Sequence, residues 1–203
     1  MLAKLMALFL LGLIRVLTGA QARWLGCPPK AELRIYFANH QSHADLVMIW
    51  AALPKELRHS TRAIAARDYW TRTPFKRWLT SQVFNVVYVS RERSADEDPL
   101  EPLVDALGKG DSLILFPEGT RGHAGDPQAF KAGLYNLACK FPQAVLVPAW
   151  INNVQHVLPK GEVVPVPVLC SVTFGAPMQV APGEACRPFL ERARHAVMAL
   201  REA

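Results

Sequence analysis

A histidine and an aspartate five residues apart, His40 and Asp45, are the residues in this sequence best suited to acid–base chemistry. A carboxylate that bonds to Nδ1 of a histidine holds the ring in one tautomer and leaves Nε2 free to take a proton from a hydroxyl group. On one continuous helix, this spacing would turn the two side chains about 140° apart. We therefore expect His40 in the turn before a helix and Asp45 in the first turn of that helix.

Two other interpretations of this segment do not require a catalytic base. Ser42 and Asp45 have the spacing of a helix capping box, a role that is compatible with the first one. A metal site formed by His40, His43 and Asp45 is a weaker interpretation, because the H-E-x-x-H pattern is absent and no remote cluster of ligands completes it.

A second segment with candidate functional residues, FPEGTR at 116–121, also follows an apolar run. Gly119 can adopt a positive φ and bring backbone N–H groups close to an anion, and Arg121 can form two hydrogen bonds to a phosphate. As an isolated hexapeptide, the segment also fits a surface turn with an ion pair between Glu118 and Arg121. Arg91, at the end of another apolar run, would be a solvated charge if taken alone.

The candidate segments lie between short apolar runs and stretches with a helical pattern. The runs predict strands over residues 33–38, 61–66, 83–89, 112–116, 145–151 and 168–174. Helices are predicted over residues 45–52, 70–80, 99–107, 130–141 and from 184 or 188 to 202. This alternation indicates an α/β fold with a mostly parallel sheet flanked by helices. Such sheets bind ligands where strands hand over to helices, which is where residues 39–45 lie.

The first 24 residues are interpreted as an N-terminal membrane-associating helix, followed by one α/β domain over residues 25–203. Residues 2–22 are leucine-rich and helical in pattern, but Arg15 interrupts them, and a bilayer span needs about 20 apolar residues. Lys4 and Arg15 share one stripe of the helical wheel, which is typical of a membrane-interfacial helix with its leucines and Phe9 toward lipid.

Two alternatives for this segment fit less well. A secretory signal would end at the A-x-A sequence of residues 20–22, but Arg15 is poorly placed for its apolar region. An ordinary core helix would leave much leucine exposed, because the polar stripe is narrow.

Composition excludes several classes of protein. Of the 203 residues, 51% are apolar and 20% charged, which excludes dominant disorder and a polytopic membrane protein. The four cysteines form no C-x-x-C pair, which argues against a zinc ribbon or a disulfide scaffold and fits a reducing cytosol.

The net charge of +6 is concentrated in the first half of the chain. Residues 55–93 carry nine basic and three acidic side chains, whereas residues 94–203 carry nine basic and twelve acidic ones. A basic half suits an anionic partner, either nucleic acid or a membrane surface, and the leucine-rich N-terminus favours the membrane. Aromatic residues interleave with cations over residues 69–78; they fit a membrane interface or an amphipathic helix whose rings face the core.

Taken together in chain order, the candidate segments resemble the sequence blocks of the glycerophospholipid acyltransferase superfamily, the PlsC-like 1-acylglycerol-3-phosphate acyltransferases. The H-x-x-x-x-D block from His40 to Asp45 and the F-P-E-G-T-R block at 116–121 match throughout. A strand that ends in Arg91 and the pair Val147-Pro148 stand where two other blocks are expected. The resemblance spans residues 33–151.

This resemblance implies a membrane-associated O-acyltransferase on the cytoplasmic face of the inner or plasma membrane. It implies that His40 is the general base, that Asp45 is its partner, and that Arg91, Glu118, Gly119, Thr120 and Arg121 bind the glycerol phosphate end of the acceptor. The donor would be acyl-CoA or acyl carrier protein, the acceptor 1-acylglycerol 3-phosphate and the product phosphatidic acid. No acyl-enzyme, metal, redox cofactor or nucleic acid is implied, and backbone N–H groups in the 39–42 turn or near Gly119 are candidate oxyanion donors.

One departure from the family pattern concerns the acceptor. Ser90 stands where an acidic residue is expected before Arg91, which keeps glycerol 3-phosphate, another lysophospholipid or an aminolipid open as acceptors. A noncatalytic lipid-binding relative is a further alternative, against which the intact pair of His40 and Asp45 argues.

Overall fold

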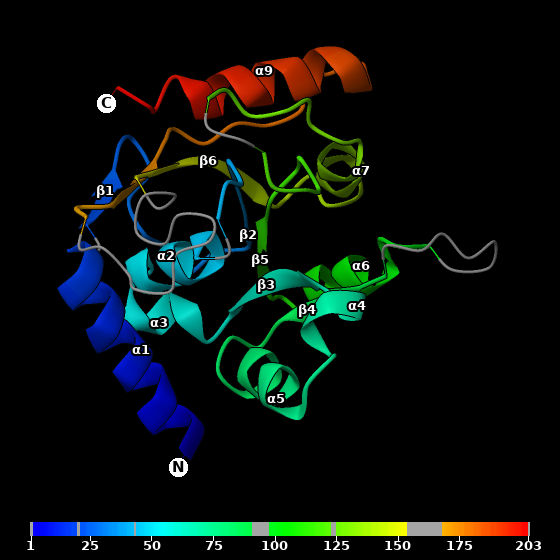
Figure 1. Ribbon diagram of the computed structural model, residues 1–203. Helices are drawn as coiled ribbons and strands as arrows, with labels where there is room; N and C mark the ends of the chain where they lie inside the picture. Colours follow the sequence, from blue (N-terminus) through cyan, green and yellow to red (C-terminus); the bar gives the residue numbers. More distant parts are fainter. Residues whose placement is uncertain are drawn as a thin grey trace.

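A seven-stranded sheet forms the centre of the chain (Figure 1). The computed structural model describes residues 2–19, 21–42, 44–90, 98–122, 125–153 and 168–202. The strands are β1 (Gln21–Trp24), β2 (Arg34–Ala38), β3 (Thr61–Ala66), β4 (Val87–Val89), β5 (Ser112–Leu115), β6 (Val145–Asn152) and β7 (Ser171–Phe174). Their order in the sheet is β1-β7-β6-β2-β5-β3-β4, and every neighbouring pair is parallel except β6 and β7. The predicted α/β fold with a mostly parallel sheet is confirmed.

Helices cover both faces of this sheet. The described ones are α1 (Leu2–Thr18), α2 (Asp45–Ala52), α3 (Lys55–Arg58), α4 (Arg67–Trp70), α5 (Pro74–Gln82), α6 (Glu101–Gly108), α7 (Gly133–Lys140) and α9 (Cys186–Met198). Tyr36 and Ala38 of β2 pack against one core cluster, which contains α2, whereas Ile35 and Phe37 pack against another, which contains α6, α7 and α9. In Figure 1 the blue helix α1 runs along one side of the molecule and the red helix α9 lies across the top. A central strand buried on both faces explains why β2 is apolar.

The N-terminal segment is shorter as a helix than its pattern predicts. Helix α1 ends at Thr18 and is followed by Gly19 at φ 65°, a left-handed conformation that glycine adopts easily and that ends many helices. Residues 21–24 then form β1, which pairs with β7 from Gln21↔Ser171 to Trp24↔Phe174. The prediction that this helix extends to residue 22 was therefore wrong at its C-terminal end. The division into segments 1–24 and 25–203 stays a prediction, although residues 21–24 join the sheet.

Two further differences from the expectation have identifiable causes in single residues. The single helix expected over residues 70–80 is two helices, because Thr73 caps α5 through the Lys76 N–H at 3.2 Å and Pro74 occupies its first turn. The strand expected over 83–89 begins only at Val87, because Asn85 adopts φ 48° and turns the chain.

Helix α1 presents apolar side chains on two sides. Ala7, Leu10, Leu11 and Ile14 pack against the core that contains α2. The opposite side, called here the outer face of α1, consists of residues whose exposure is between 42% and 82%: Leu2, Leu5, Leu8, Phe9, Leu13 and Val16. Among the described residues, no helix is both long and apolar enough to cross a bilayer.

Candidate active site

The two sequence segments with candidate functional residues meet at the carboxyl edge of the sheet. Strands β2 and β5 are parallel neighbours, with Phe37 paired to Leu115, so the residues that follow each strand lie on the same edge. The N–H of Gly122 donates to the carbonyl of His40 at 2.8 Å, which joins the two segments directly. The parallel topology therefore brings together residues that are about eighty positions apart in the sequence.

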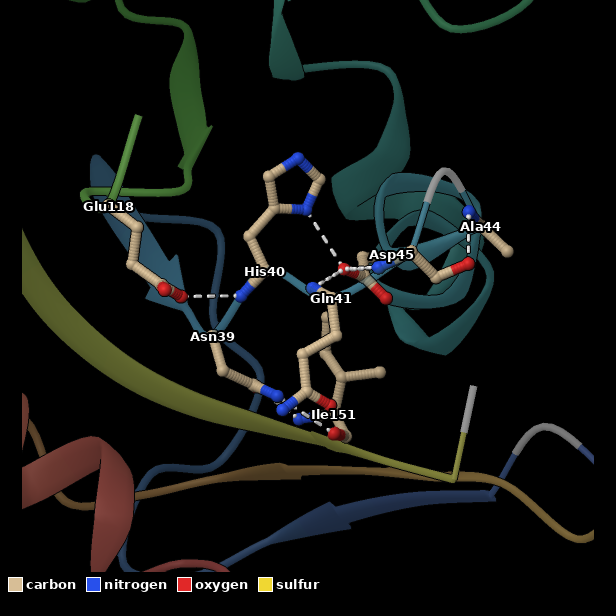
Figure 2. Close-up of polar contacts among 8 residues, drawn as sticks. Asn39, His40, Gln41, Ala44, Asp45, Glu118 and Ile151 are labelled. Carbon is tan, nitrogen blue, oxygen red and sulfur yellow. Dashed lines mark hydrogen bonds and ion pairs between the residues drawn. The ribbon is translucent and has the colours of Figure 1, made fainter. Parts of the chain in front are cut away.

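His40 and Asp45 form the pair that their spacing predicts. His40 lies in the turn after β2, Asp45 is the first residue of α2, and His40 Nδ1 is 2.9 Å from Asp45 Oδ2 (Figure 2). An ionised carboxylate can only accept, so Nδ1 donates and Nε2 keeps its lone pair. Figure 2 shows Nε2 on the side of the ring away from Asp45. The His40 side chain is 21% exposed, whereas that of Asp45 is only 2% exposed, so Nε2 is the accessible end of a buried pair.

One oxygen of Asp45 also organises the turn that carries His40. Asp45 Oδ2 accepts from the N–H of Gln41 at 2.6 Å and from that of Ser42 at 2.8 Å. The hydroxyl of Ser42 accepts from the Ala44 N–H rather than from that of Asp45, so only half of the predicted capping box forms. Asp45 thus combines the structural and the chemical roles that its spacing allowed.

Glu118 holds the same turn from the other side. It is 2% exposed, and its two carboxylate oxygens each accept a backbone N–H, that of His40 and that of Gln128, both at 2.8 Å. Burial raises the pKa of Glu118, against the two backbone hydrogen bonds that lower it. Glu118 is therefore a positioning residue in this structure. The surface ion pair with Arg121 that a simple turn would form does not exist between these two described residues.

Asn39 anchors the turn to the neighbouring strand β6. Its side-chain amide accepts from the Ile151 N–H at 2.8 Å and donates to the Ile151 carbonyl at 3.0 Å (Figure 2). Because Asn39 is buried and both ends of the amide are used, it fixes the residue that precedes His40. No role was predicted for the side chain of Asn39, although its place directly before His40 was a usable signal.

The other residues expected at the acceptor site are placed less directly. Gly119 adopts φ 69°, as its expected role required. Thr120 and Arg121 are exposed and lie outside the lining of the cavity next to His40. Arg91 and His43 lie outside the described residues. Binding of the acceptor by Arg91, Glu118, Gly119, Thr120 and Arg121 stays a prediction.

A cavity of about 280 Å³ opens beside His40. Its wall is mainly apolar and comes from the ends of β3, β4 and β5 and from α4, α6 and α7; it includes Ile64, Trp70, Val89, Leu103, Leu115 and Leu134. The ring of Phe116 stacks on the imidazole of His40, with 4.3 Å between ring centres and 17° between planes. This stacking fixes the imidazole at the wall of a mainly apolar cavity.

Four of the backbone N–H groups that were candidate oxyanion donors are already engaged. Those of Gln41 and Ser42 donate to Asp45, that of His40 donates to Glu118, and that of Gly119 donates to the Phe116 carbonyl at 3.0 Å. The turn uses these N–H groups to hold its own shape.

The fold and the site define an α/β protein with a histidine–aspartate pair at the carboxyl edge of a parallel sheet. Residues 28–152, more than half of the chain, match the Acyltransferase family model, and the chain therefore belongs to the acyltransferase family.

Curated relatives carry one activity in their names. The chain is similar to the chloroplastic 1-acyl-sn-glycerol-3-phosphate acyltransferase LPAT1 of Arabidopsis thaliana, with 29% identity over 63% of this chain and 34% of that protein. It is 28% identical to 1-acyl-sn-glycerol-3-phosphate acyltransferase alpha of Homo sapiens, over 66% of this chain and 46% of that protein. The Borreliella burgdorferi enzyme of that name is 29% identical, over 74% and 56%. The chain thus spans between about a third and a little over half of these relatives.

A solved structure shares the fold. The crystal structure of PlsC, the 1-acyl-sn-glycerophosphate acyltransferase from Thermotoga maritima, matches with a TM-score of 0.70 at 21% identity. The match covers 98% of this chain and 80% of that one, so the α1 segment is included in the shared architecture.

Proposed function

We propose that this protein transfers a fatty acyl group from an acyl thioester to the free hydroxyl of 1-acylglycerol 3-phosphate, giving phosphatidic acid. The observation that carries the proposal is the buried Asp45 bonded to Nδ1 of His40, which leaves Nε2 free at the wall of an apolar cavity. The activity in the names of the relatives supports the choice of acceptor.

In the proposed reaction His40 acts as a general base. Nε2 takes the hydroxyl proton while the hydroxyl oxygen forms a bond to the thioester carbonyl carbon. The tetrahedral intermediate then collapses, the carbon–sulfur bond breaks, and the thiolate leaves and takes up the proton. Asp45 stabilises the imidazolium that forms between these two steps. A positioned base of this kind contributes about 10²- to 10⁴-fold to the rate.

The apolar cavity supports a long-chain substrate. Its lining combines aliphatic side chains with Phe116 and Trp70, and the ionisable groups that line it among the described residues are His40 and Lys131. We assign the acyl chain to this cavity because transfer of apolar surface out of water is favourable at about 25 cal/mol per Å².

We also propose that the outer face of α1 lies on the membrane surface. Its apolar residues are exposed, and Lys4 and Arg15 are exposed along one flank. Arg58 on α3 lies close enough to Arg15 for the two charges to repel each other, and burial together with this repulsion lowers the pKa of Arg58. Anionic lipid headgroups near this pair of arginines would compensate the repulsion.

Helix α5 offers a second contact with the same surface. Phe75 is 60% exposed and lies beside Trp78, whereas Trp70 lines the cavity, so only part of the aromatic segment faces outward. In Figure 1 the N-terminal end of α1 and helix α5 both lie at the lower end of the molecule. We also propose the cytoplasmic face of the membrane as its location, with which four free cysteines are compatible.

Thiol release from an acyl-CoA by purified protein tests the proposal. The assay is run in liposomes with and without lysophosphatidic acid, with His40→Ala as the control. We expect release that depends on both the acceptor and His40. Release that is the same in His40→Ala would remove His40 as the base. Absence of release with acyl-CoA and with acyl carrier protein donors, for every lysolipid tried, would overturn the proposed function.

A further inference from the structure

Lys131 lies where the end of a loop meets the turn of the FPEGTR segment. Its backbone N–H donates to the Pro117 carbonyl at 2.8 Å, which fixes the lysine against this turn immediately before α7. Its side chain crosses Gly119 so closely that a Cβ atom built there would be 2.6 Å from the ammonium nitrogen. The absence of a side chain at Gly119 therefore provides the space that the lysine occupies.

The ammonium group of Lys131 has no protein partner within the described part of the chain. No hydrogen bond or ion pair joins it to another described side chain. Glu118 is in the same turn, but its carboxylate is directed inward and accepts from the N–H groups of His40 and Gln128 instead. Lys131 is the one lysine or arginine in the described lining of the cavity next to His40. An exposed, unpaired cation in the lining of a mainly apolar cavity suits a ligand that is apolar at one end and anionic at the other.

We propose that Lys131 binds the phosphate group of the acceptor while His40 takes the proton of its hydroxyl. The inference rests on the proposed function and adds a residue for which the sequence predicted no role. Only two carbon atoms and one ester oxygen separate the free hydroxyl oxygen of 1-acylglycerol 3-phosphate from its phosphorus atom. A phosphate-binding cation must therefore share a cavity wall with the base, and Lys131 does so.

Two other anionic groups in the reaction fit this position less well. The phosphates of coenzyme A are separated from the thioester by the whole pantetheine arm, so a cation next to His40 is too close to the reacting carbon to bind them. The developing oxyanion needs donors in a site closed to water, whereas the side chain of Lys131 is exposed.

The test compares two acceptors that differ only in the phosphate, lysophosphatidic acid and 1-monoacylglycerol, with acyl-CoA as donor. The variants are Lys131→Ala, Lys131→Arg and, as a matched control, Lys140→Ala, which removes an exposed lysine from the other end of α7. We expect Lys131→Ala to raise KM for lysophosphatidic acid about 10- to 100-fold, the loss expected for a hydrogen bond to a charged group. KM for monoacylglycerol should be unchanged, and Lys131→Arg should restore most of the affinity.

Two outcomes would overturn the inference. An unchanged KM for lysophosphatidic acid would remove Lys131 from the site. An equal loss of kcat with both acceptors would show that the lysine acts on the oxyanion or on the fold. Thermal unfolding of each variant distinguishes an effect on the oxyanion from an effect on the fold. Removal of an exposed side chain that does not support the fold should leave the melting temperature unchanged.

A binding measurement separates this inference from the proposed function. Lysophosphatidic acid is titrated, without acyl donor, into His40→Ala and into the double variant with Lys131→Ala, and the tryptophan fluorescence, to which Trp70 in the cavity wall contributes, is followed. Binding that requires Lys131 supports the inference even if no transfer is ever observed. Binding that does not require Lys131, together with His40-dependent transfer, would overturn the inference and leave the proposed function standing.

Discussion

Replacing Asp45 by asparagine tests how the site controls the charge and the tautomer of His40. The change keeps the size of the side chain but removes the negative charge 2.9 Å from Nδ1. An amide has one acceptor atom and one donor group, so if the amide nitrogen turns toward Nδ1, the ring proton moves to Nε2 and the base is lost. If the amide oxygen turns that way, the tautomer survives but the imidazolium loses its counter-charge.

The expected loss of activity in Asp45→Asn follows from the distance between His40 Nδ1 and Asp45 Oδ2. At 2.9 Å and an effective dielectric constant of about 20, two unit charges attract each other by about 6 kcal/mol. The 21% exposure of His40 screens part of this energy, and we expect Asp45→Asn to raise the activation free energy by about 3–5 kcal/mol, or to lower kcat about 10²- to 10⁴-fold.

Stability should fall much less than activity. The backbone N–H groups of Gln41 and Ser42 can still bond to the amide oxygen, but each bond loses its charge-assisted part. We expect a loss of about 1–2 kcal/mol, which is about 2–8 °C in melting temperature for a chain of this size.

The assay measures kcat and KM with acyl-CoA and lysophosphatidic acid, next to thermal unfolding of the same samples. Asp105→Asn is the matched control, because it makes the same chemical change at an exposed ion pair on α6. A variant that keeps kcat within about tenfold of the original, while its melting temperature falls as expected, would refute the assigned role of Asp45 in charge and tautomer control. A loss of activity that matches the unfolded fraction would reduce Asp45 to a structural residue.

Two further predictions concern the buried glutamate and the outer face of α1. Burial raises the pKa of Glu118 above its ordinary value of 4.5, so the folded state binds this proton more tightly than the unfolded state does. Its contribution to stability is therefore full at low pH and is lost as the pH rises through the raised pKa. Glu118→Gln should remove this slope in melting temperature measured from about pH 4 to about pH 7, and should cost about 1–3 kcal/mol because one backbone N–H loses its acceptor. An unchanged slope would show that another group titrates. Phe9→Ser, at a side chain 63% exposed, should weaken sedimentation with anionic vesicles about tenfold or more and leave the melting temperature unchanged. Leu10→Ser, its neighbour on the packed side, should lower the melting temperature by several degrees, and equal effects of the two would contradict the division of α1 into two faces.

Elements with strong periodicity could be predicted from the sequence, and elements set by single residues could not. Strands such as β3 and helices such as α2 were expected with their observed bounds, because apolar runs and helical spacing are local properties. Strand β1 was missed because a run of only four residues is a weak signal next to the helical pattern that precedes it, and its extended conformation is supported by pairing with β7. Thr73 and Pro74 are a usable capping signal, and the division between α4 and α5 could have been found from them.

The candidate site shows a similar limit. The meeting of His40 and Asp45 could be predicted from their spacing together with the expected start of a helix between them. The inward direction of Glu118 could not be predicted, because a glutamate beside an arginine in a polar turn is usually solvated, and here two distant backbone N–H groups outcompete water. Lys131 carried no signal either, since its place next to Gly119 depends on the path of the loop before α7.

The connection between α1 and the sheet has a consequence for how the protein would sample its substrate. The carbonyls of Leu17 and Thr18 accept from the N–H groups of Val168 and Cys170, and α1 contacts α2, the helix that begins with Asp45. A helix held in this way cannot roll on a bilayer independently of the turn that carries His40. On a membrane, the cavity would keep a constant height and tilt above the leaflet, so turnover would follow the mole fraction of acceptor in the plane of the membrane and fall on dilution with inert lipid at constant bulk concentration.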